Sequence, residues 1–126
     1  MQFTTADALL MLGRILLGGL FVYGGIKHFF IVPILTEFMT KRGVPCPKLT
    51  LIAGSVFQTV VGALLMANLF VVPAAFGLII FTVIASVMFL NFWDMPAGEP
   101  REAAKNNVAV NVAVIGGLLL AAAQGM

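Results

Sequence analysis

Long apolar segments alternate with short polar ones along this chain. Between Leu49 and Trp93 about 45 residues pass without one Asp, Glu, Lys or Arg. At 1.5 Å per residue a single helix of that length would extend roughly 65 Å, about twice the hydrocarbon core of a bilayer. Soluble proteins place charge on the outer face of nearly every element, so this stretch predicts two membrane-spanning helices.

The same pattern predicts four spans, each near the roughly 20 residues that a bilayer requires. They cover about residues 7–27, 49–68, 73–93 and 106–124. The turn from Asn68 to Pro73 is short and uncharged, and proline suits the first turn of a helix, so the second and third spans form an antiparallel hairpin. The predicted fold is all-α, a four-transmembrane-helix bundle that makes up a single integral membrane domain over residues 1–126.

The loop between the first two spans has a helical pattern of its own. Apolar residues recur at helical spacing from Pro33 to Gly43, while polar ones occupy the other side. We expect a short helix that lies in the membrane interface. The alternative is an extension of the first span that bends at Pro33, since proline interrupts helices.

Composition agrees with a membrane protein and excludes several classes of function. Of the 126 residues 61% are hydrophobic and 10% are charged. A net charge of +2, scattered through short loops, does not make a nucleic-acid-binding surface. The single cysteine, Cys46, excludes an internal disulfide and a Cys-rich metal site, and the single histidine, His28, excludes a bis-histidine haem site. We expect no metal and no haem.

The basic residues predict a topology. The two longer loops contain six of the seven, namely Lys27, Lys41, Arg42, Lys48, Arg101 and Lys105, and Arg14 lies inside the first span. The positive-inside rule then places both charged loops in the cytoplasm and both termini outside. No Lys or Arg precedes the first apolar run, so this run is expected to remain as a helix and not to be cleaved as a signal peptide.

The first span places a charge, two glycines and an imidazole on one face. Its members, Arg14, Gly18, Phe21, Gly25 and His28, recur every three or four residues. Glycines at this spacing let a neighbouring helix approach closely. Two interpretations of Arg14 remain open: it snorkels to the outer interface, or it contacts an anion or a carbonyl group. His28, beside Lys27, is either an interfacial anchor or a proton donor or quinone contact.

The other spans also have polar positions. In the second, Gln58 lies between Gly54 and Gly62 at intervals of four residues, and the third and fourth contain the pairs Thr82 with Ser86 and Asn107 with Asn111. Such residues either form hydrogen bonds between helices or line a polar cleft in the bundle. Trp93 is expected to belong to an aromatic belt at the membrane surface, and Cys46, between two prolines, is expected to be a bystander thiol.

The order of these features resembles the DoxX family of small four-helix membrane proteins. The resemblance covers nearly the whole chain and rests on Arg14, Gly24 and Lys27, on Gly43-Val44-Pro45-Cys46-Pro47, on a Gly-rich second span, on Phe92-Trp93-Asp94-Met95, and on Asn111 with Gly116-Gly117-Leu118-Leu119-Leu120. It implies an integral protein of the bacterial cytoplasmic (inner) membrane that is associated with redox systems. A quinone is the cofactor, and a membrane oxidoreductase the partner, that the resemblance suggests.

Three positions depart from the pattern of the family. Relatives commonly have a glutamate where Gln58 stands and a histidine where Asn91 stands. They often have a lysine where Val110 stands, unless Lys105 takes its place one turn earlier. Amides can hold a ligand by hydrogen bonds but do not exchange protons near neutral pH. We therefore expect a protein that is not catalytic on its own.

Three hypotheses follow. The first is an accessory or ligand-binding subunit of a membrane redox assembly, with Arg14, Gln58, Asn91 and Asn111 as polar contacts to a quinone-like head group or to a partner. Further candidates for such contacts are Lys27, His28 and Trp93. The second is a small membrane scaffold whose glycines pack against partner helices. The third is an oligomeric transporter, which is disfavoured because every Asp and Glu falls at a boundary or in a loop. The sequence leaves the ligand, the partner and homo-oligomerisation open.

Overall fold

The computed structural model describes residues 3–90 and 92–126 of the chain. In chain order the elements are α1 (Thr5–Phe30), α2 (Val32–Lys41), α3 (Pro47–Met66), α4 (Val71–Phe89), the short 3₁₀ helix η1 (Phe92–Asp94) and α5 (Glu99–Gly125). Four of the helices are long and apolar enough to cross a membrane, and a short helix lies between the first two of them. The predicted all-α class is confirmed.

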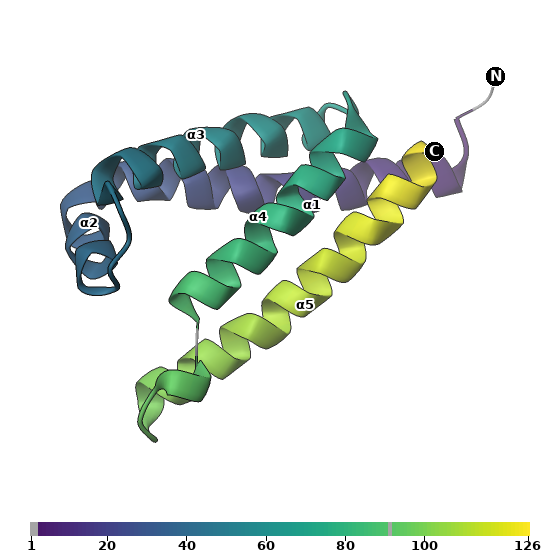
Figure 1. The fold of residues 1–126 in the computed structure, drawn as a ribbon. Helices are drawn as coiled ribbons and strands as arrows, with labels where there is room; N and C mark the ends of the chain where they lie inside the picture. Colours follow the sequence, from purple (N-terminus) through teal and green to yellow (C-terminus); the bar gives the residue numbers. More distant parts are fainter. Residues whose placement is uncertain (1–2, 91) are drawn as a thin grey trace.

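The long helices form two pairs (Figure 1). Helices α1 and α3 lie side by side, and α4 and α5 lie side by side and cross the first pair at an angle. The two pairs meet mainly where α3 contacts α4, with a smaller contact between α1 and α5. Helix α2 covers the end of α3 at which the chain enters it.

The start of α1 and the break before α2 have local causes. Thr4 and Asp7 form a capping box, in which the Asp7 N–H donates to Thr4 Oγ1 (3.1 Å) and the Thr4 N–H donates to the Asp7 carboxylate (3.0 Å). The helix ends at Phe30, and α2 restarts at Val32 with Pro33 in its first turn, where proline needs no partner. The prediction of a separate short helix in this loop is confirmed. A continuous extension of α1 that bends at Pro33 is not found.

Two helix ends are closed by residues in the left-handed conformation. Gly43, at φ 76°, ends α2 so that the Val44 N–H donates to the Met39 carbonyl (3.1 Å). Asn68, at φ 61°, ends α3 in the same manner, and the Leu69 N–H donates to the Leu64 carbonyl (2.9 Å). The closure at Asn68 forms the tight turn between α3 and α4 that the sequence predicted for this hairpin.

The end of α4 and the start of α5 come next. Helix α4 ends at Phe89, and Arg42 donates to its last carbonyls, those of Met88 and Phe89 (3.3 Å each), which satisfies acceptors that have no partner within the helix. Helix α5 begins at Glu99, seven residues before the predicted 106. Its first turns are polar, and hydropathy detects only the part of a helix that fits an apolar environment.

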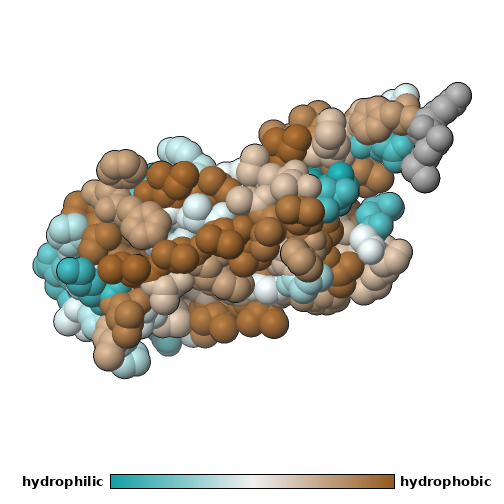
Figure 2. Space-filling model, turned by 90° about the horizontal axis from the view of Figure 1, so that it is seen from above, coloured by the Kyte–Doolittle hydropathy of each residue, from teal (hydrophilic) through white to brown (hydrophobic). Residues whose placement is uncertain are grey.

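The surface of the molecule is largely apolar. Large hydrophobic side chains are exposed on all four long helices, among them Leu16, Val60, Ile80 and Val112. Figure 2 shows hydrophobic residues over most of one face, a large group of hydrophilic residues at one end and a smaller group toward the other. With 26 residues, α1 is about 39 Å long, which exceeds the roughly 30 Å of a bilayer core. The apolar surface therefore faces lipid, and the chain is an integral membrane protein.

Candidate functional site

A groove lies between α1 and α5. Its volume is about 600 Å³, which lies within the range of small-molecule sites. Its walls are Leu9, Leu10, Gly13, Arg14, Leu16, Leu17 and Leu20 from α1, and Gly117, Leu120, Ala121, Ala123 and Gln124 from α5. Arg14 is the one charged group in a lining that is otherwise almost entirely apolar, and Gln124 contributes an amide.

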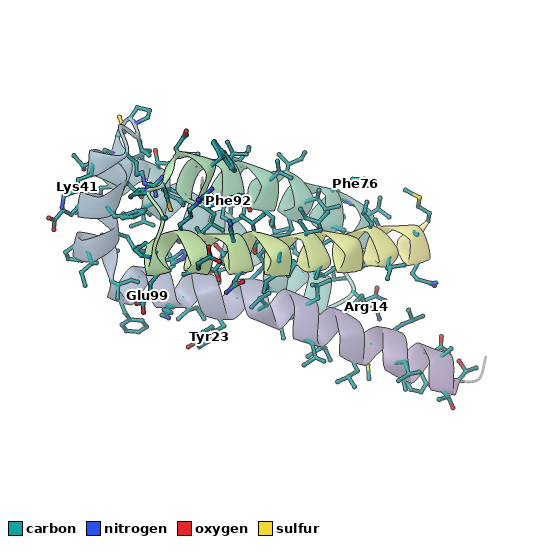
Figure 3. The ribbon with its side chains drawn as sticks, turned by 90° about the horizontal axis from the view of Figure 1, so that it is seen from below. Arg14, Tyr23, Lys41, Phe76, Phe92 and Glu99 are labelled. Carbon is teal, nitrogen blue, oxygen red and sulfur yellow. The ribbon has the colours of Figure 1, made fainter. Side chains whose placement is uncertain are left out.

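Arg14 has no protein partner among the described residues. Its Nε is buried without a hydrogen-bond partner, and none of the residues 3–90 and 92–126 forms an ion pair or a hydrogen bond with it. Figure 3 shows Arg14 on the side of α1 that faces α5. The side chain as a whole is half-buried, so Nε lies against the protein while other parts of the side chain are exposed. A charged group without a countercharge is costly in an apolar lining.

Gly13 lies beside open space on the α1 wall of the groove. A β-carbon added at Gly13 would meet no atom of another part of the protein within 4 Å. On the opposite wall, a β-carbon at Gly117 would reach Leu17 at 3.6 Å, an ordinary contact distance. Close helix packing therefore does not require glycine at position 13. A glycine at this position leaves the groove wider than any larger residue would.

The other glycines of α1 have a different role. A β-carbon at Gly18 would stand 2.5 Å from the Gly62 backbone oxygen, and one at Gly25 would collide with Thr59 and approach the Ser55 carbonyl to 3.0 Å. These glycines let the backbones of α1 and α3 touch. Gly54 is different, since its β-carbon would meet the Phe81 ring at 3.5 Å, which is ordinary contact.

Gln58 is buried in the α1–α3 contact. It is 8% exposed, and its Oε1 is buried without a hydrogen-bond partner. A β-carbon at Gly24 would stand 2.6 Å from Gln58 Nε2, so the amide is packed against the backbone of α1. This position puts Gln58 inside the bundle, away from the residues that line the α1–α5 groove.

His28 links the same two helices nearer the charged end. Its Nδ1 lies 3.2 Å from Ser55 Oγ, and Ser55 is almost fully buried. Lys27, its neighbour, is exposed. His28 thus has a partner inside the protein as well as a position near a membrane boundary.

Asn111 lies in the contact between α4 and α5. Its Nδ2 donates to Ser86 Oγ (2.9 Å), and the Ser86 hydroxyl donates in turn to the Thr82 carbonyl (2.7 Å). A smaller cavity of about 200 Å³ adjoins this pair and is lined on one side by Trp93, which is 54% exposed and stacks edge-on against Phe92. A hydrogen bond of this kind between membrane helices contributes about 0.6 kcal/mol.

The predicted polar residues therefore do not converge on one cleft. Arg14 of α1 faces α5. Gln58 of α3 packs against α1, and His28 of α1 pairs with Ser55 of α3. Asn111 of α5 forms a hydrogen bond with Ser86 of α4. Asn91 lies outside the described residues. Sequence reasoning missed Gly13 and Gln124, because nothing along the chain shows that the start of α1 and the end of α5 are neighbours. Within the described residues no three acidic, His or Cys side chains are grouped so that they could hold a metal.

Comparison with known proteins agrees with this architecture. The DoxX family model matches residues 9–91, from the first turns of α1 past the end of α4. The chain is similar to the inner membrane protein YphA of Escherichia coli (strain K12), with 27% identity over 117 residues, which cover 93% of this chain and 83% of that protein. No solved structure matches.

Proposed function

The chain belongs to the DoxX family, and from this premise we propose that it is an accessory, ligand-binding subunit of a membrane redox assembly with a lipid-soluble, quinone-like ligand. The observation that supports this proposal is the groove between α1 and α5, where Arg14 has no partner. The redox association comes from the family resemblance.

The groove has the chemistry that such a ligand needs. The Arg14 guanidinium and the Gln124 amide are hydrogen-bond donors that suit a carbonyl oxygen of the head group. Leu16, Leu20 and Leu120 offer an apolar path for a hydrocarbon tail. A quinone would supply the electron-carrying chemistry, and this chain would bind and orient it. The amides of Gln58 and Asn111 do not exchange protons near neutral pH, which fits a role without catalysis of its own.

A scaffold without ligand receives less support. That hypothesis uses the glycines to pack against partner helices, but Gly18, Gly25 and Gly62 are buried within the chain, in the contact of α1 with α3. They are not available to a partner. The transporter hypothesis also receives less support. It needs a carboxylate inside the membrane, and the one acidic residue of α1, Asp7, is engaged in the cap at the start of that helix.

Filling the groove tests the ligand-binding proposal. We expect the protein purified from its native membranes in mild detergent to carry a quinone and to retain oxidoreductase subunits, as identified by mass spectrometry. Gly13→Leu should lose the quinone, because Gly13 lines the groove and a leucine side chain would fill part of it. Gly116→Leu is the matched control, since Gly116 also has open space around it and does not line the groove. If the wild-type protein carries neither quinone nor oxidoreductase, the proposal is wrong.

We also propose that the charged loops face the cytoplasm, in an inner membrane like that of the similar Escherichia coli protein. Cys46 is the single cysteine and is exposed at the start of α3. A membrane-impermeant maleimide should therefore label inverted membrane vesicles and leave intact spheroplasts unlabelled. Labelling of spheroplasts alone would reverse the topology. A Cys46→Ser variant controls for labelling of other groups.

A further inference from the structure

We propose that the α1–α5 groove binds, in preference to a neutral quinone, a single-chain amphiphile whose head is an oxyanion, either a carboxylate or a phosphate. The inference rests on the proposed function in one respect, because it takes the same groove as the ligand site. It adds the charge of the head group and predicts a second class of ligand that competes for the site.

No acidic side chain of the described residues forms an ion pair with Arg14. Asp7 is the nearest acidic residue along α1, and it lies two helical turns away with its carboxylate engaged by the Thr4 N–H. The remaining acidic side chains are on α2, on η1 and in the first turn of α5, at the opposite end of α5 from Gln124. The carbonyl end of α5 adjoins the groove and contributes at most roughly half a negative charge.

A neutral carbonyl would satisfy hydrogen bonds of the guanidinium without balancing its charge. In an apolar lining the charge term is large, because little water screens it. A carboxylate or a phosphate offers both a countercharge and paired acceptor oxygens that match the guanidinium fork. The unpartnered, buried Nε of Arg14 is one of the donors that such a head would engage.

The shape of the groove indicates one hydrocarbon chain. Gly13 on one wall and Gly117 on the other have no side chain to fill the groove, and leucines line both walls beside them. Arg14 lines the same groove, and a head group would lie at its guanidinium. At about 600 Å³ the groove is suited to one chain and a small head.

Equilibrium binding to the full chain in a non-ionic detergent tests the inference, with tritiated oleate as the probe. The unlabelled competitors are oleoyl lysophosphatidic acid, oleyl alcohol and a decyl-substituted benzoquinone. We expect the lysophosphatidic acid to displace oleate and oleyl alcohol and the quinone to compete at least about tenfold more weakly. Stronger displacement by the lysophosphatidic acid would identify a lipid phosphate as the natural head, and weaker displacement would identify a fatty-acid carboxylate.

Variants of the two cations on α1 separate charge recognition from general adsorption. Arg14→Gln should weaken oleate binding about tenfold to a hundredfold, Arg14→Lys should retain part of it, and Lys27→Gln should leave it unchanged, since Lys27 is exposed near the other end of α1. Size-exclusion profiles confirm that each variant is folded, and Arg14→Lys remains informative if Arg14→Gln is not.

Other results would overturn the inference. Equal competition by oleyl alcohol, or unchanged oleate binding in Arg14→Gln, would show that the head charge is not recognised. If the quinone alone binds and Gly13→Leu abolishes its binding, the inference fails and the proposed function stands. If no probe binds and Arg14→Gln instead loses a copurifying protein, a partner's carboxylate is the countercharge, and both the inference and the ligand-binding proposal fail.

Discussion

Gly18→Ala is expected to lower the free energy of unfolding by about 1–3 kcal/mol, the usual cost of overpacking a well-packed contact. The added β-carbon would stand 2.5 Å from the Gly62 carbonyl oxygen and 2.6 Å from Met66 Cγ. The methionine side chain can move aside, but the backbone oxygen cannot unless α1 and α3 separate. Thermal or detergent-induced unfolding of the purified protein, followed by circular dichroism, measures the change.

The matched control for this substitution is Gly116→Ala. A β-carbon at Gly116 meets nothing within 4 Å, and alanine favours a helix over glycine by up to about 1 kcal/mol. The same chemical change should therefore leave stability unchanged or raise it in α5. Equal effects at the two positions would show that α1 and α3 do not pack backbone to backbone. Gly25→Ala, which meets Thr59 and the Ser55 carbonyl, should behave like Gly18→Ala.

The packing role of Gly18, Gly25 and Gly62 could be predicted from spacing because helical periodicity places such residues on one face. The identity of the helix against which they pack could not be predicted, because every span has small residues and any two spans could have paired. The same limit applies to the turns. Gly43 was expected to end α2, whereas the capping of α4 by Arg42 joins residues that are 46 and 47 positions apart along the chain.

The candidate site shows this limit most clearly. Arg14 stood out as a charge inside a span, but its groove is made with the last turns of α5. Gly117 and Gln124 lie about a hundred residues further along the chain, and no local pattern relates them to Arg14. The expectation that Gln58 and Asn111 would share a cleft with it rested on residue type alone. Hydrogen bonds between helices use the same residue types as a ligand site, and Asn111 forms one with Ser86.

Gln58→Met is expected to raise the free energy of unfolding by about 1–3 kcal/mol, against the usual direction for a substitution in a packed contact. Gln58 is 8% exposed, and its buried Oε1 accepts no hydrogen bond. Methionine keeps the unbranched shape against Gly24 and removes the unsatisfied carbonyl. The measurement is the same unfolding assay, on ligand-free protein in detergent.

Ser55→Ala supplies the contrast for Gln58→Met on the same face of α3. Ser55 is also buried, at 2% exposed, but has His28 as a partner at 3.2 Å. Loss of this hydrogen bond should cost roughly 0.6 kcal/mol. Opposite signs for the two substitutions would show that Gln58 is tolerated in the α1–α3 contact at a cost in stability. A loss of stability in Gln58→Met would mean that Oε1 has a donor in the membrane, a water molecule or a ligand hydroxyl. Gln58 would then return as a ligand contact, separate from the groove at Arg14.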